Sequence, residues 1–257
     1  MTDRDREFKD AYELYSREIY NFSRKMTGNP MVAEDITHDT FLQAYINRDS
    51  FRGESSLRTW LYSIARNNCF LYFRKTKKTR FEDIEDLIDK TADPQSCSVY
   101  SEMEKRVYIS QVKEGCLLGL IRCLPGRQRT AFILYVFNDF SAGETARILG
   151  ISPNAVRILI HRARSGLKSF LCRNCSLYNK SNPCRCENLI SFSLKQGWIN
   201  QERDPGEALK TLSELREFRD EIALYRSLGN SPVPENLTAR VSEFISSSDF
   251  GIFSEKK

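Results

Sequence analysis

The chain has 257 residues with 39 Lys and Arg against 34 Asp and Glu, and this net charge of +5 indicates no particular partner. Its length suits two small domains and an extension, because domains usually hold about 100–150 residues. The first six residues are charged, and the longest apolar run, residues 131–137, is far shorter than the roughly 20 residues that span a bilayer. We therefore expect a cytoplasmic protein that does not bind a membrane.

The first 45 residues predict two helices. Apolar residues recur every three or four positions from Phe8 to Met26, which places them on one buried stripe, and Gly28-Asn29-Pro30 ends that helix. A second helix is predicted over residues 32–45. We expect its inward face to hold Ile36, Phe41, Ala44 and Tyr45, and its outward face to hold Glu34, Asp35, His38 and Asp39.

A third predicted helix starts at Leu57 and combines basic with aromatic side chains. Residues 57–80 contain basic residues and no acid. Aromatic rings beside cations suit single-stranded or melted DNA, because unstacked bases need a flat ring face and the backbone needs positive charge. By their period, Trp60, Leu61, Ile64, Ala65 and Leu71 face the core. The outward set for nucleic acid is Asn67, Asn68, Tyr72, Arg74 and Lys75.

The next segment, residues 79–104, predicts a linker. It is acidic, contains Pro94 and lacks a lasting period. A structured acidic strip is the alternative. Helical pattern returns over residues 102–124, stops at Leu124-Pro125, and resumes from Thr130 to Val136.

Residues 141–164 predict a helix-turn-helix. Ser141 and Glu144 have the spacing of a capping box, Gly150 supplies the turn, and Ser152-Pro153 begins a second helix that runs to about Phe170. The early part of such a second helix enters the DNA major groove. Its candidate DNA contacts are Ser152, Asn154, Ala155, Arg157, Ile158, His161 and Arg162, with Arg164 and Lys168 further along for phosphate. A plain surface hairpin of two helices is the alternative.

Four of the eight cysteines lie within residues 172–186, as Cys172-x-x-Cys175 and Cys184-x-Cys186. Four thiolates can close a tetrahedral zinc site, and nearby Arg173, Lys180 and Arg185 would favour the thiolates. We therefore predict one Zn²⁺ held by these four residues, with either a structural or a sensing role. A thiol switch without metal is the alternative, and Cys69, Cys97, Cys116 and Cys123 are interpreted as buried apolar residues.

The chain resembles the extracytoplasmic-function group of the sigma-70 family over roughly residues 8–172. Three motifs carry this resemblance by their order and spacing: residues 33–41, residues 51–67, and residues 124–129 followed by the helix-turn-helix. His38 stands where that family often has Gln. The resemblance implies that the chain is no enzyme but directs bacterial core RNA polymerase, through its β and β′ subunits, to promoter DNA. An anti-sigma factor is a further candidate partner.

The resemblance also assigns roles to residues. It implies that Glu34, Asp35, Thr37, Phe41 and Gln43 face the polymerase, and that the second helix of the helix-turn-helix reads the minus-35 element. It further implies that the loop and helix from Phe51 onward melt and hold the minus-10 element. The minus-10 candidates are Phe51, Arg52, Arg66, Asn67, Asn68, Tyr72, Arg74 and Lys75.

The predicted fold is all-α, with two small helical domains. We expect a sigma region 2 bundle at residues 1–78, the linker at 79–104, the region 4 helix-turn-helix at 105–171, and a cysteine-rich extension with a helical tail at 172–257. Cysteine-rich tails of related factors resemble metal- or redox-responsive regulators. A one-component helix-turn-helix regulator with a zinc-binding tail is the alternative function, and a thiol enzyme using Cys172 and Cys175 lacks the βαβ pattern of thioredoxin-like folds.

Overall fold

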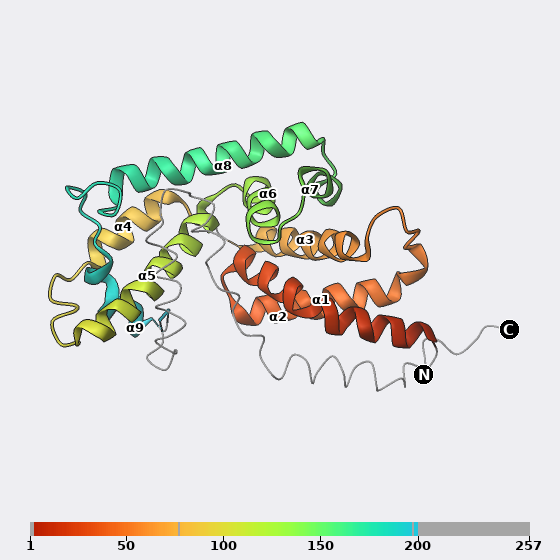
Figure 1. Cartoon of the computed structure of the whole chain (residues 1–257), viewed down its shortest axis with the longest axis horizontal. Helices are drawn as coiled ribbons and strands as arrows, with labels where there is room; N and C mark the ends of the chain where they lie inside the picture. Colours follow the sequence, from red (N-terminus) through yellow and green to blue (C-terminus); the bar gives the residue numbers. More distant parts are fainter. Residues whose placement is uncertain (1–2, 77, 197, 200–257) are drawn as a thin grey trace. The chain divides into compact units, whose positions relative to one another are not determined.

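A computed structural model describes residues 3–76, 78–196, 198 and 199 of the chain. These residues form helices and short turns, with no strand longer than a single β-bridge, so the predicted all-α class is confirmed. The helices α1 to α9 follow one another along the sequence (Figure 1). None of the helices in this part of the chain is long and apolar enough to cross a membrane. The predicted helical tail, from residue 200 onward, lies outside the described residues.

The described chain divides into two compact units between Tyr72 and Phe73. The first unit contains α1 (Asp3–Thr27), α2 (Pro30–Ile46) and most of α3 (Leu57–Lys75). Asn29 caps α2, because its side chain accepts hydrogen bonds from the backbone of Met31 and Val32. The same residue therefore ends the turn after α1 and starts the next helix.

Aromatic rings fill the space between α1 and α2. Tyr12 meets Phe41 edge-on at 4.8 Å, and Phe8 meets Tyr45 in the same way at 5.1 Å. Phe22 and Tyr62 form a similar pair at 5.2 Å, which joins α1 to α3. Such edge-to-face pairs contribute about 0.5–1.5 kcal/mol beyond the burial of their area.

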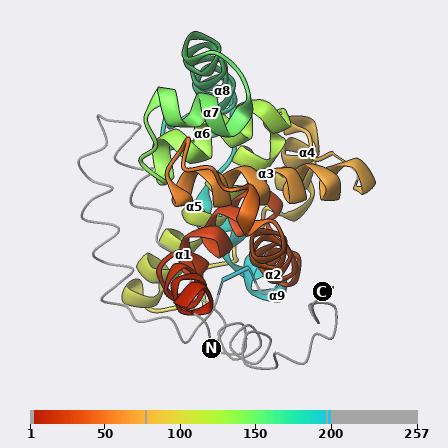
Figure 2. The same cartoon turned by 90° about the vertical axis from the view of Figure 1, so that its right-hand side faces the viewer.

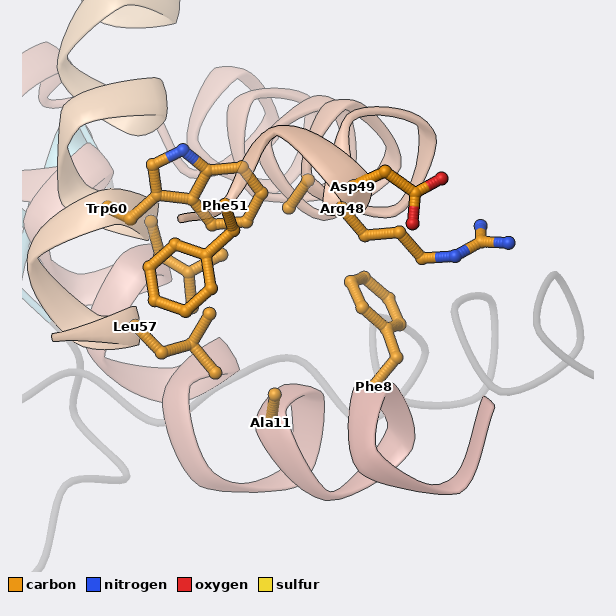
Figure 3. Close-up of a pocket in the computed structure, with 9 residues that line it drawn as sticks. Phe8, Ala11, Arg48, Asp49, Phe51, Leu57 and Trp60 are labelled. Atoms are coloured by element: carbon orange, nitrogen blue, oxygen red, sulfur yellow. The ribbon is translucent and has the colours of Figure 1, made fainter. Parts of the chain in front are cut away.

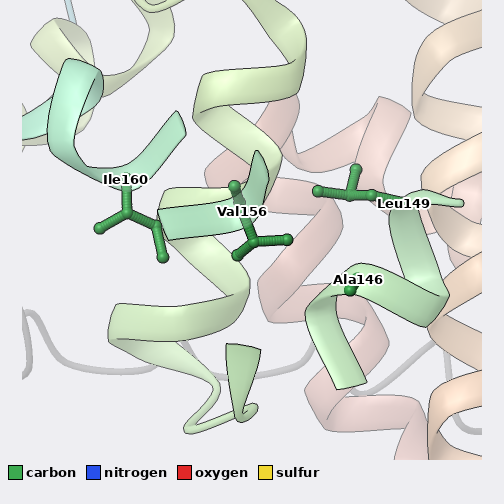
Figure 4. Packing of buried hydrophobic residues seen from close by; sticks show 5 residues of the cluster. Ala146, Leu149, Val156 and Ile160 are labelled. Carbon is green, nitrogen blue, oxygen red and sulfur yellow. The ribbon is translucent and has the colours of Figure 1, made fainter. Parts of the chain in front are cut away.

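The second unit contains α4 (Phe81–Thr91), α5 (Glu102–Cys123), α6 (Gly126–Phe137), α7 (Ala142–Leu149), α8 (Pro153–Asn174) and α9 (Ile190–Lys195). Helices α6 and α7 pack against α8 (Figures 1 and 2). Their shared core contains Ala146, Leu149, Val156 and Ile160 (Figure 4), and Ala131 completes it.

The segment predicted as a linker contains α4, so the expectation of an irregular segment is corrected. Asp83 accepts from the backbone of Arg80 at 2.7 Å and fixes the start of this helix. Ile84, Leu87 and Ile88 form a narrow apolar face, and Phe81 packs on Phe170 of α8 with 5.5 Å between ring centroids. The structured acidic strip is therefore present.

Residues on both sides of Pro94 are joined by hydrogen bonds to the cysteine-rich segment. Asn174 donates to Glu85 at 2.8 Å, the backbone of Asp93 donates to the carbonyl of Asn188, and Ser191 bonds to Ser96 through both backbone and side chain. The side chain of Ser96 is buried. These contacts make residues 81–96 part of the second unit.

Candidate nucleic-acid interface

The helix-turn-helix has the local structure that its sequence predicts. Ser141 and Glu144 form the reciprocal capping box, and Gly150 adopts the left-handed conformation, with φ 66°, that the turn requires. Ser152 caps α8 by accepting from the backbone of Ala155 at 3.2 Å. Each signal is local in sequence, and together they fix where α7 ends and α8 begins.

One face of α8 is buried and the opposite face carries the predicted DNA contacts. Val156, Ile160, Ala163 and Leu167 are buried. The exposed set is Ser152, Asn154, Arg157, Ile158, His161 and Arg162, and Ala155 is half-buried beside it. Ile158 is an apolar side chain 46% exposed at the centre of this polar set. An exposed face of this kind can enter a groove without disturbing the core behind it.

The first unit contains a cavity of about 430 Å³ next to α3. Phe51 and Trp60 form one wall, with ring centroids 5.2 Å apart, while Phe8 and Arg48 lie on the other (Figure 3). Leu57 and Asp49 complete the rim. Apolar rings, one cation and one carboxylate around a hollow of this size suit a flat heteroaromatic group such as an unstacked base.

Of the pocket residues, only Phe51 was predicted as a site residue. Trp60 was interpreted as core, but it is half-buried and presents its ring to the cavity. Phe8 comes from α1 and Arg48 from the short 3-10 turn at residues 48–50. The interleaving of aromatic and basic residues around Phe51 was the available signal, whereas the approach of Phe8 depends on tertiary packing.

The predicted minus-10 residues fall into three classes of exposure. Arg52, Asn67, Arg74 and Lys75 are exposed, and Phe51, Arg66 and Tyr72 are half-buried. Asn68 is buried at 7% exposure: it donates to Thr40 at 3.3 Å and accepts from Gln43 at 3.2 Å. Its expected outward position is therefore wrong, because its amide joins α2 to α3.

Leu71 also differs from its expected position. It was predicted to face the core, but it is 52% exposed, while Tyr62 and Cys69 are fully buried instead. The period of α3 is preserved, and the buried face is rotated relative to the predicted one. A stripe of mixed aromatic and basic residues does not reveal which side faces the neighbouring helices.

Three of the five predicted polymerase-facing residues reach the surface of α2. Asp35 and Gln43 are exposed and Glu34 is half-buried. Thr37 is fully buried and donates to the carbonyl of Ala33 at 2.6 Å, and Phe41 is buried against Tyr12. The side chains of Thr37 and Phe41 therefore support α2 from inside and are not at its surface.

An ion pair fixes α3 against α1. Arg58 donates to Glu18 at 2.7 Å, and the hydroxyl of Tyr62 donates to the same carboxylate at 3.3 Å. Burial, and next the charge of Glu18, raise the pKa of Tyr62, so this hydroxyl stays a donor. The contact sets the orientation of the helix that carries the minus-10 candidates.

The clustered cysteines lie where α8 ends. Cys172 is exposed on the last turn, Cys175 and Cys186 are partly buried, and Cys184 is buried. Cys175 and Cys184 are partners in a parallel β-bridge. Four thiols have the donor chemistry that zinc prefers, but among the described residues no three Cys, His, Asp or Glu side chains are in position to hold a metal ion.

Two family models match the chain: Sigma-70 region 2 over residues 11–79 and Sigma-70, region 4 over residues 114–167. The first contains the pocket residues except Phe8, and the second contains the whole helix-turn-helix of residues 141–164. The cysteine segment lies beyond the second match.

Similar proteins come from several bacteria. The RNA polymerase sigma factor YlaC of Bacillus subtilis is 35% identical over 62% of this chain and 89% of its own length. The ECF RNA polymerase sigma factor SigW of the same species is 31% identical over 64% of this chain and 88% of its own. A solved structure of the sigma factor RpoE of Bartonella quintana, bound to the anti-sigma factor NepR, is 25% identical over 64% of this chain and 96% of that one, with a TM-score of 0.45. The identity and coverage of the two Bacillus proteins, together with both family models, establish that this chain belongs to the extracytoplasmic-function group of the sigma-70 family of RNA polymerase sigma factors.

Proposed function

We propose that this sigma factor recognises a promoter with two separate surfaces: the exposed face of α8 for the minus-35 element, and the pocket beside α3 for a base of the minus-10 element. The pocket formed by Phe51, Trp60 and Phe8 is the observation that carries the proposal. It offers ring faces and one cation at the same hollow, which is what an unstacked nucleotide needs.

Melting requires no catalytic residue in this scheme. A base that leaves the duplex loses stacking at a cost of a few kcal/mol, and stacking in the pocket offsets that cost. Arg52, Arg74 and Lys75 are exposed around α3 and can contact the phosphates of the opened strand. The pocket therefore shifts the equilibrium towards open DNA by binding only that state.

Core polymerase is the protein partner in this proposal, and the α2 surface with Glu34, Asp35 and Gln43 is its docking surface. These residues are polar and accessible, whereas Thr37 and Phe41 support the helix from inside. An Asp35→Ala variant should bind core polymerase several-fold more weakly and unfold at an unchanged temperature. Wild-type affinity in that variant would remove α2 from the docking surface.

The test of the proposed function is transcription with purified core polymerase and the full chain. Permanganate detects unpaired thymines, so the wild-type protein should produce reactive thymines near the minus-10 element and run-off transcripts from the same template. Binding to double-stranded DNA without any affinity for core polymerase would instead support a one-component regulator.

We also infer that the cysteine segment makes this sigma factor responsive to a thiophilic metal, zinc being the simplest candidate. The support is chemical: four cysteines within 15 residues, beside three basic side chains, lie directly after the DNA-reading helix. A thiol switch without bound metal is the alternative, and a purified chain that takes up no zinc would favour it.

A further inference from the structure

The buried stripe of α8 determines where its exposed side chains point. Val156, Ile160, Ala163 and Leu167 are buried at intervals of three and four residues, and the first two share a core with α7 (Figure 4). Successive residues of an α-helix are turned by about 100° around its axis, so Ile158 is turned by about 200° from Val156. Ile158 therefore points almost directly away from the core of its domain.

The start of α8 is fixed by its cap, which gives Ile158 a defined place along the helix. Ser152 accepts from the backbone of Ala155 at 3.2 Å, and α8 begins at Pro153. Ile158 consequently lies in the second turn, within the early part of the helix that enters the major groove in the proposed function. An isoleucine in a helix also has one strongly preferred χ1 rotamer, because it branches at Cβ. Its side chain is therefore held in a nearly fixed direction.

Ile158 differs in chemistry from the residues around it. Its neighbours on the surface of the helix, three or four positions away, are Asn154, His161 and Arg162, and all three are exposed. Of the large apolar side chains that the structure describes on α8, only Ile158 is exposed, at 46%. A single exposed apolar residue is common on protein surfaces. Here its position decides the interpretation, because it lies at the centre of the polar face that we propose for the minus-35 element.

The major groove offers a suitable apolar group to such a side chain. All four bases present hydrogen-bond donors or acceptors there, and thymine alone adds a 5-methyl group. Isoleucine can neither donate nor accept, so it would desolvate a donor or an acceptor without replacing the lost hydrogen bond. Against a 5-methyl group the same side chain buries apolar surface on both partners. The side chain of Ile158 therefore favours thymine over the other bases.

We propose that Ile158 determines specificity at one base pair of the minus-35 element by contacting the 5-methyl group of a thymine. This inference rests on the proposed function and deepens it, because it names the chemical group that one residue of α8 reads. Ile158 was predicted as one of seven candidate DNA contacts, with no role of its own. Its direction and its lack of polar atoms assign it to base reading, since a phosphate contact needs a donor or a positive charge.

The first experiment changes only the methyl group. The full chain, assembled with core polymerase, selects promoters from a DNA library of random sequence, which reveals the minus-35 element. Each thymine of that element is then replaced by deoxyuridine, which lacks the 5-methyl group and keeps the pairing with adenine. We expect replacement at one position to weaken binding of the polymerase complex by about 3- to 5-fold, as for the loss of one buried methyl group.

Two variants connect this effect to one side chain. Ile158→Ala should bind the thymine and deoxyuridine promoters with equal affinity, whereas Ile158→Val keeps a branched apolar side chain and should keep most of the preference. Arg162→Ala is the matched control from the same exposed face: it should weaken binding to both DNAs by the same factor and leave the preference unchanged. Any effect of deoxyuridine on the shape of the duplex would persist in Ile158→Ala, so the double-mutant cycle removes it.

Misfolding does not confuse this test. Ile158 is exposed and Ala is a better helix former than Ile, so Ile158→Ala should unfold at the wild-type temperature or slightly above it. Its affinity for core polymerase should also be unchanged, and a loss of that affinity would assign Ile158 to a protein contact and overturn the proposal. The proposal is equally overturned if Ile158→Ala retains the preference for thymine, if no replacement by deoxyuridine weakens wild-type binding, or if the selected element contains no thymine.

Failure of this inference is distinguishable from failure of the proposed function. A polymerase complex that selects a minus-35 element but is indifferent to the methyl group contradicts the role of Ile158 alone. A polymerase complex that selects no sequence at that position contradicts the proposed reading by α8, and the role of Ile158 with it.

Discussion

The two regions that we propose for DNA binding differ in shape. The α8 face is convex, with exposed side chains above a fully buried core, whereas the α3 region is concave, with half-buried rings around a hollow. A convex helix fits the groove of an intact duplex, and a hollow accepts a base that has left it. Exposure therefore marks candidates for duplex reading, while partial burial beside a cavity marks candidates for melting.

Truncation of the pocket should have the largest effect on function. Trp60→Ala removes a ring face, and stacking of one base is worth about 1–3 kcal/mol, so open complexes should fall by roughly 5- to 150-fold. Permanganate reactivity measures this loss. Trp60→Phe keeps a ring and should retain most of the opening, and thermal unfolding of both variants checks the fold. Normal opening by a folded Trp60→Ala variant would exclude the pocket from melting.

The second largest effect is expected from the removal of one base-reading candidate, which should weaken binding to the minus-35 element. Arg157→Ala should cost about 1–3 kcal/mol and relax the preference for one base pair. Lys168→Ala is the matched control on the same helix: it should weaken binding equally for all sequences and reduce the salt slope by about 1. The two effects are compared by titrating the polymerase complex against single-base promoter variants. Equal behaviour of both variants would mean that Arg157 contacts phosphate only.

Two adjacent residues of α3 are expected to differ in role: Asn68 stabilises the fold, and Asn67 contacts DNA. Asn68→Ala removes the two hydrogen bonds that join α2 to α3, each worth about 0.5–1.5 kcal/mol, so it should lower the free energy of unfolding by about 1–3 kcal/mol. Asn67→Ala should leave stability unchanged and reduce promoter opening. Urea unfolding measures the stability of both variants, and permanganate reactivity measures their promoter opening. A stable Asn68→Ala variant that opens the promoter poorly would return Asn68 to the DNA-binding set.

The smallest expected effect concerns the cap of α8. Ser152→Ala removes the acceptor for the Ala155 backbone and should cost about 1 kcal/mol of stability. Ser152→Asn keeps an equivalent cap, so it should unfold like the wild-type protein. If Ser152→Asn also binds the minus-35 element normally, Ser152 acts through the helix; weaker binding at unchanged stability would assign it a direct contact.

Features set by neighbouring residues were predictable from the sequence. The capping box at Ser141, the turn at Gly150 and the start of α8 at Ser152-Pro153 all lie at their predicted positions. Each depends on backbone hydrogen bonds within a few residues, which the residue types determine directly. The resemblance to the sigma-70 family then predicted how these local elements belong to two domains.

Features set by distant packing were not predictable in the same way. Whether Asn68 or Leu71 faces inward depends on where α2 lies beside α3, and both expectations were wrong. Helix α4 has an apolar face too short to predict the helix from the sequence, and its packing partners Phe170 and α5 are distant or undefined until the chain has folded. The approach of Phe8 to Phe51 and Trp60 in the pocket likewise joins residues far apart in sequence.

The hydrogen bonds between residues 85–96 and 174–191 have a consequence for synthesis on the ribosome. Chains emerge from the N-terminus and domains generally fold as units in that order, so the first unit can fold while the second is still being translated. Helix α4 emerges early and α5 follows it directly, but its partners Phe170 and Asn174 come 89 residues after Phe81 and Glu85, which takes roughly 5–20 seconds to translate. During that interval only α5 is present to cover the acidic helix, and the second unit can be completed only after the cysteine segment has been translated.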